Sequence, residues 1–128
     1  MREEDPELLL ISAGDFFAEK GILELYRSRF LADMMMLARY DAAAVGENEL
    51  SYELKPILEE KEAGLPLVCA NVYMDGDRLF EPFIIKEISG SKIGIFGLLG
   101  IDPEDETGIE YGDPIAEGIE VAGELREL

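Results

Sequence analysis

Acidic and amide side chains gather in two short turns, which are the segments of this sequence best suited to chemistry. The first turn carries Asp15, and the second carries Glu47, Asn48 and Glu49. Carboxylate oxygens are the ligands that hard divalent cations such as Mg²⁺, Ca²⁺ and Mn²⁺ prefer, and affinity grows with the number of converging oxygens. The two turns therefore indicate a site for a ligand, with carboxylates that could contact a cation.

The same turns could also line a crevice for a small ligand. Asn48 and Glu49 would form part of such a crevice, together with Asn71, whose amide can both donate and accept hydrogen bonds. A structural interpretation stands beside this one. In it, Asp15 and Glu47 cap or line strand-to-helix turns, and Asn71 bonds to neighbouring backbone.

The sequence lacks histidine, the side chain that most catalytic sites use. Histidine is the usual proton carrier near neutral pH and the commonest neutral metal ligand. Dyads of serine or cysteine with histidine are therefore excluded, and no residue is assigned a catalytic role. The single cysteine, Cys69, lies in an apolar run and is interpreted as a small buried residue rather than a reactive thiol.

Apolar runs predict the strands that position the two turns. The runs cover residues 8–11, 40–45 and 67–72, and each of the first two is followed closely by a glycine. Continuous apolar runs of this length are typical of parallel strands that are covered on both faces. Ligands in open α/β sheets bind at the carboxyl ends of such strands, so the two acidic turns are expected to share one edge.

Three helices are predicted, over residues 19–39, over 50–63 and from Pro114 onward. Pro56 is tolerated only near a first turn, so the regular part of the second helix should begin close to Glu53. Apolar residues at three- and four-residue intervals are expected to face the core. In the first helix they are Ile22, Leu25, Tyr26, Phe30, Met34, Leu37 and Ala38, and in the last helix they are Ile115, Ile119, Ala122 and Leu125.

Two further strands, 83–88 and 92–98, surround a predicted hairpin turn at residues 89–91. The resulting order predicts an α/β layered sandwich with a mixed, initially parallel sheet flanked by helices. One partial domain over residues 1–128 is expected, with a flexible N-terminus at residues 1–6 and an acidic loop at residues 102–113.

The charge excludes some partners. The formal net charge of the 128 residues is −18, and such a surface repels the phosphate backbone of nucleic acids. No apolar run reaches the roughly 18–20 residues that a membrane-spanning helix needs. We therefore expect neither nucleic acid nor a membrane as a partner. The first six residues lack the basic and apolar regions of a secretory signal, and the compartment is not assigned.

Five segments together resemble a known family, the calcineurin-like metallophosphoesterases, and within it the N-terminal domain of the bacterial 5′-nucleotidase group. They occur in the order of the family and cover most of the chain: residues 10–17, 40–50, 66–73, 83–87 and 92–98. The resemblance implies an αββα sandwich and hydrolysis of phosphate esters by two metal ions, which activate a water molecule and neutralise phosphoryl charge.

The resemblance also implies roles for single residues. Asp15 takes the place of the metal-bridging aspartate, and the segment Gly46 to Glu49 takes the place of Gly-Asn-His-Glu. Glu47 then stands where the family has a ligand asparagine, and Asn48 stands where it has a catalytic histidine. The resemblance thus implies Asp15 and Glu47 as candidate ligands of a weakly held divalent cation, Mn²⁺, Mg²⁺ or Ca²⁺. Asn48 cannot transfer a proton. The opening Asp-x-His segment of the family has no counterpart in this sequence.

These departures predict a non-catalytic or incomplete 5′-nucleotidase-like domain that acts as a scaffold or interaction module, either by itself or as a fragment of a longer protein. An uncovered sheet edge or apolar face would favour a homo-oligomer or a covering protein partner. The alternative is a metal-dependent phosphoesterase or nucleotidase that uses Asp15, Glu47 and Glu49 and is completed by missing segments or by a partner chain.

Overall fold

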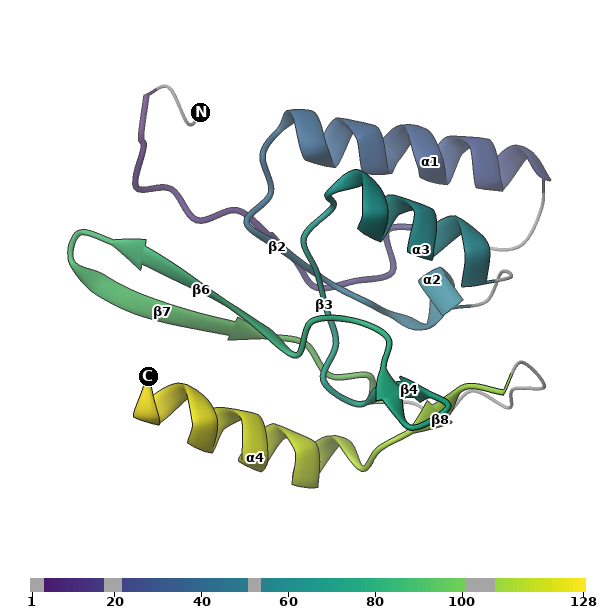
Figure 1. Cartoon of the computed structure of the whole chain (residues 1–128). Coiled ribbons are helices and arrows are strands. Elements are labelled where there is room, and N and C mark those ends of the chain that lie inside the picture. The colour runs from purple at the N-terminus through teal and green to yellow at the C-terminus, as the bar shows by residue number, and fades with distance from the viewer. Residues whose placement is uncertain (1–3, 18–21, 51–53, 101–107) are drawn as a thin grey trace.

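The fold is layered, with helices on both sides of the strands (Figure 1). The computed structural model describes residues 4–17, 22–50, 54–100 and 108–128. Helices α1 (Ile22–Leu37) and α3 (Leu54–Ala63) lie on one side, and helix α4 (Pro114–Glu127) lies on the other. This is the α/β arrangement that the sequence predicts.

A short parallel sheet carries the two acidic turns. It contains β1 (Ile11–Ser12), β2 (Ala42–Ala44) and β3 (Leu67–Val68) in that order. Both pairings are parallel, as expected for strands that are joined through helices. The turns after β1 and β2 therefore lie at the same edge, and the four-residue helix α2 (Glu47–Leu50) begins in the second turn.

The strand predicted over residues 67–72 is in fact two strands in different sheets. It ends as β3 at Val68 and resumes as β4 (Val72–Met74), which pairs with β5 (Asp77–Arg78) and β8 (Glu110–Tyr111). Between them, the amide of Ala70 donates to the carbonyl oxygen of Gly97 at 2.8 Å. The buried backbone thus finds partners outside the parallel sheet, which an apolar run cannot reveal.

The hairpin is confirmed. Strands β6 (Phe83–Ile88) and β7 (Ser91–Phe96) pair antiparallel over their whole length. Ser89 and Gly90 both have positive φ, 51° and 78°, as a type I′ two-residue turn requires. Of the expected acidic loop 102–113, residues 102–107 lie outside the described residues, and Glu110 and Tyr111 form β8.

Helix α4 begins where the sequence predicts, but its inward face differs. The side chain of Asp113 accepts from the amides of Ile115 and Ala116 and so caps the helix. Val121 is fully buried, whereas Ile115 and Ile119 are 74% and 71% exposed, so the prediction for these two isoleucines is wrong. Glycine permits a close approach here, since a Cβ at Gly118 would lie 2.8 Å from Cδ1 of Leu98.

The predicted core stripe of α1 is also wrong for the residues that the structure describes. Ser28, Ala32 and Met35 are the buried residues. The bulkier apolar side chains that were expected to face inward point to solvent: Tyr26, Phe30, Met34 and Leu37. Small Ser28 and Ala32, one turn apart, let α1 lie close to its neighbours. The side chains of Ile22 and Leu25 lie outside the described residues.

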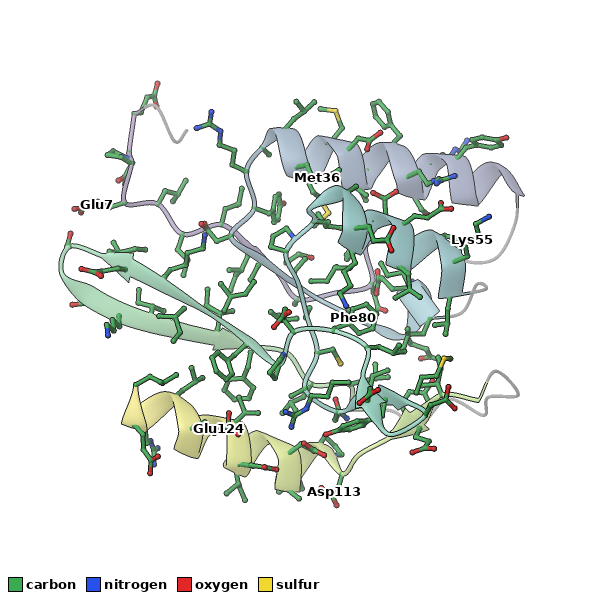
Figure 2. The ribbon with its side chains drawn as sticks, in the orientation of Figure 1. Glu7, Met36, Lys55, Phe80, Asp113 and Glu124 are labelled. Atoms are coloured by element: carbon green, nitrogen blue, oxygen red, sulfur yellow. The ribbon has the colours of Figure 1, made fainter. Side chains whose placement is uncertain are left out.

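The core lies between the helix pair α1–α3 and the strands. Phe80, labelled in Figure 2, is 2% exposed and belongs to this core. Other large buried members are Phe17, Ile57 and Val72. In the part of the chain that the structure describes, no helix is long and apolar enough to cross a membrane.

Candidate functional site

The two acidic turns touch each other, and glycine allows it. Asp15 adopts a left-handed conformation with φ of 53°, directly after Gly14 with φ of 99°. A Cβ at Gly46 would lie 2.3 Å from Oδ1 of Asp15 and 2.7 Å from its amide nitrogen. Only glycine fits at position 46 without moving backbone, so the sequence places it where the second turn passes over the first.

Glu49 joins the two turns through their backbone. Its side chain is 0% exposed. Oε2 accepts from the amides of Gly46 at 2.6 Å and Asp15 at 3.0 Å, and Oε1 accepts from the amide of Phe17 at 2.9 Å. These are charge-assisted hydrogen bonds in a buried setting. Glu49 therefore acts as a backbone clamp in this structure.

The side chain of Asp15, in the first turn, also bonds to the backbone of the second turn. Its Oδ1 accepts from the amide of Asn48 at 3.0 Å, in the first turn of α2. Asp15, Asn48 and Glu49 are thus brought together. Glu47, the first residue of α2, is exposed to solvent.

The donor set does not fit the two-metal centre that the family resemblance implies. Glu49 is buried and uses both oxygens on amides, and Asp15 directs one oxygen at the amide of Asn48. The described ranges contain no group of three or more acidic or thiol side chains placed to hold a metal ion. Asn48 supplies no proton carrier. A single weakly held cation at Asp15 and Glu47 stays a prediction.

Asn71 is buried and saturated with hydrogen bonds to other segments. It is 1% exposed, and its Nδ2 donates to the carbonyl oxygens of Leu99 at 2.8 Å and Gly112 at 3.1 Å. Its Oδ1 accepts from the amide of Leu99 at 2.8 Å. These bonds tie the link between β3 and β4 to two distant segments. The partners of Asn71 named here are all outside the two acidic turns.

Cys69 is inert in the folded protein. The thiol is fully buried, and burial raises its pKa to about 11. Hydrogen bonds from the backbone of Asn71 and Leu99 lower the pKa, but by less than burial raises it. Sγ lies 3.6 Å from Oδ1 of Asn71. Because the thiolate is the reactive form, this thiol offers no nucleophile, as the sequence predicts.

A cavity of about 250 Å³ opens on the sheet beside the first turn. Its lining comes from the parallel strands and from the end of β7 with the residues that follow each: Ile11, Ser12, Ala13, Ala42, Ala44 and Val68, with Ile95, Phe96, Gly97 and Leu98. None of these side chains is charged. The cavity therefore suits an apolar group and offers no cation to a phosphate.

A local signal for the clamp exists in the sequence. A glutamate three residues after a helix N-cap often reaches back to the cap amide, which is one half of a capping box. Gly46 and Glu49 have this spacing, and their bond has this geometry. The contacts of Glu49 with Asp15 and Phe17 are more than thirty residues apart in sequence, and local spacing does not reveal them.

The chain is similar in sequence to bacterial 5′-nucleotidases. No protein-family model matches it. A 5′-nucleotidase of Vibrio cholerae is 34% identical over 131 residues, which cover 94% of this chain and 23% of the relative. Protein UshA of Yersinia enterocolitica is 35% identical over 131 residues, with 94% and 24% covered. This chain is a partial 5′-nucleotidase-like domain.

A solved structure supports the same assignment. The 5′-nucleotidase precursor of Thermus thermophilus superposes with a TM-score of 0.73 at 29% identity, over 93% of this chain and 25% of that chain. The resemblance to the 5′-nucleotidase group of metallophosphoesterases is therefore confirmed. The nucleotidase-like domain spans about a quarter of the length of the relatives it matches.

Proposed function

We propose that this partial 5′-nucleotidase-like domain is non-catalytic and works as a scaffold or interaction module. The observation that carries the proposal is the use of Glu49. A buried carboxylate that accepts from three backbone amides serves the architecture of the turns. Among the described residues, no group of three acidic or thiol side chains is placed to hold a metal ion, whereas two-metal chemistry needs several such ligands. The framework of the family is kept, while Glu47 and Asn48 stand in place of its ligand asparagine and its catalytic histidine.

A phosphatase assay tests this proposal. The purified chain is incubated with a chromogenic phosphate ester and with AMP, each in the presence of millimolar Mn²⁺. We expect the same slow hydrolysis from the wild type and from Asp15→Ala. Turnover by the wild type that disappears in Asp15→Ala would overturn the proposal, because it would place Asp15 at a working centre.

The competing function is a metal-dependent phosphoesterase that further segments or a partner chain complete. The names of the relatives favour it, since two of them are called 5′-nucleotidase. Asp15 also lies exposed at the carboxyl edge of the parallel sheet, where ligands bind in open α/β folds. Metal-dependent turnover that appears only when the neighbouring segments of a related nucleotidase are added in trans would favour this function.

A further inference from the structure

The cavity beside the first acidic turn lies between two layers of the fold. One layer is the parallel sheet, and the other is the end of β7, which Figure 1 shows between these strands and helix α4. A Cβ at Gly97 would lie 2.4 Å from the carbonyl oxygen of Val68, and a Cβ at Gly94 would lie 2.7 Å from Cδ2 of Leu125 in α4. Glycine thus lets this segment pack closely against both neighbours, so the layers that enclose the cavity are held together.

Small side chains leave part of the space between the layers unfilled. Stacked sheets lie about 10 Å apart, and interdigitating side chains normally fill that gap. Here the sheet contributes Ala42 and Ala44 to the lining, and the segment after β7 contributes Gly97. These short residues account for a cavity of about 250 Å³. Exposed Ile11 and Ala13 place its opening at the β1 edge of the sheet.

The lining determines which chemistry a ligand needs. Its side chains carry no charge, and Ser12 has the only polar side chain among them. Burying a charge without a partner is costly, so the lining favours neutral ligands over anions and cations. Phe96, which is 36% exposed, also lines the cavity, and a pair of aromatic rings gains more than its buried area alone provides. A neutral aromatic molecule therefore suits the cavity best.

The volume limits the size of that molecule. An apolar cavity of about 150 Å³ in a protein holds benzene, a single ring of six carbon atoms. At the same packing, the cavity of about 250 Å³ holds about ten non-hydrogen atoms, which corresponds to two fused rings. Water competes poorly there because it needs several polar partners, and displacing loosely held water with an apolar group increases affinity.

We propose that this cavity is a binding site for a neutral bicyclic aromatic molecule of the size of indole. The ring system lies between the parallel sheet and the end of β7, in contact with Phe96. The hydroxyl oxygen of Ser12 accepts from the amide of Gly14 at 3.3 Å, and its second lone pair can accept from the N–H of an indole ring. The inference goes beyond the proposed function, because such a ligand carries no phosphate and needs no metal.

The fluorescence of indole itself tests the site. The chain has no tryptophan, so indole emission can be followed in the presence of the protein without a tryptophan background. We expect a blue shift that saturates with a dissociation constant of about 0.1–1 mM, which is typical of a ligand of this size. Indole-3-carboxylate should bind at least about ten times more weakly, since its charge finds no partner in the lining. A shift that does not saturate, or equal affinity for the two molecules, would overturn the proposal.

A substitution at the opening tests whether indole binds in the cavity. Ala13→Phe places a ring at the opening and should weaken indole binding by about tenfold or more. The matched control is Ala116→Phe, which adds the same ring at an exposed alanine of α4 and should bind indole as the wild type does. Circular dichroism should give the same helix content for all three proteins, because both alanines are exposed. Unchanged affinity in Ala13→Phe, or equal weakening in both variants, would contradict the assignment.

Methyl NMR spectra of the unsubstituted chain give a second readout that needs no variant. The ring current of bound indole should shift the methyl resonances of Ile11, Val68 and Ile95, which line the cavity. The methyl resonances of Ile115 and Ile119, exposed on α4, should stay in place. Shifts confined to these two isoleucines would overturn the proposal. None of these results bears on phosphatase activity, so the proposed function fails or stands by its own assay.

Discussion

Single residues decide how the acidic turns are used. From the sequence, Glu47 is a candidate metal ligand and Glu49 a candidate residue of a ligand crevice. In the fold the side chain of Glu49 is buried and accepts hydrogen bonds from three backbone amides, whereas Glu47, two positions earlier, is exposed to solvent. The family resemblance alone does not separate these fates. Burial and partner geometry do.

Replacement of the clamp should weaken the fold much more than replacement of its neighbour. Glu49→Gln leaves one oxygen acceptor and turns an amide group toward backbone donors, so buried N–H groups lose their partner. We expect a loss of about 2–3 kcal/mol in the free energy of unfolding. Glu47→Gln is the control and should stay within about 0.5 kcal/mol. Urea denaturation measures both, and equal effects would contradict the clamp.

A second carboxylate, Glu60, links stability to pH. Burial raises its pKa above 4.5, and the charge of Asp33 adds to the rise, while Arg29 opposes it. A raised pKa in the folded state means that the contribution of Glu60 is complete at low pH and is lost as pH rises through the folded value. Glu60→Gln should therefore melt higher than the wild type at pH 7, with a difference that shrinks toward pH 4.5. A difference independent of pH would refute this.

Elements were predicted well where local pattern determines them and poorly where tertiary contacts do. The parallel strands, the hairpin and the start of α4 follow from apolar runs, turn residues and a capping aspartate. The inward faces of α1 and α4 do not. Bulky apolar residues such as Phe30 and Ile119 face solvent, whereas the buried positions of α1 are Ser28, Ala32 and Met35 and that of α4 is Val121. Small residues at part of each contact, Ala32 in α1 and Gly118 in α4, allow the helices to lie close to their neighbours.

The glycines of α4 allow a test of that explanation. A Cβ at Gly123 meets nothing within 4 Å, whereas a Cβ at Gly118 meets Leu98 at 2.8 Å. Gly123→Ala should raise the free energy of unfolding by about 1 kcal/mol, the usual gain for alanine in a helix. Gly118→Ala should gain less, since Leu98 must shift. Thermal melts compare the two, and an equal gain would show that α4 does not approach Leu98 as closely as described.

At the scale of the whole molecule, charge opposes compactness. The net charge of the 128 residues is −18, so the acidic side chains on the surface repel one another. The ion pairs of the described residues are few and mostly exposed, with Arg78 and Glu117 at 3.0 Å the best shielded. Exposed pairs contribute little, so the fold depends on its apolar core.

Salt should therefore stabilise the protein. Raising NaCl from about 0.01 M to 0.5 M shortens the screening length from about 30 Å to a few Å. We expect the melting temperature to rise by about 4 °C, close to 1 kcal/mol for a domain of this size. A melting temperature that is flat or falls with salt would show that self-repulsion is minor.

The buried sulfur atom gives the chain an internal reporter. At pH 8 a group with a pKa of about 11 is ionised in about one molecule in a thousand, and no solvent reaches it. Alkylating reagents should modify the native protein only through opening of the core. Because no other cysteine competes for the label, the rate of alkylation measures how often Cys69 is released, and every variant above that keeps this cysteine can be ranked by it without a denaturant.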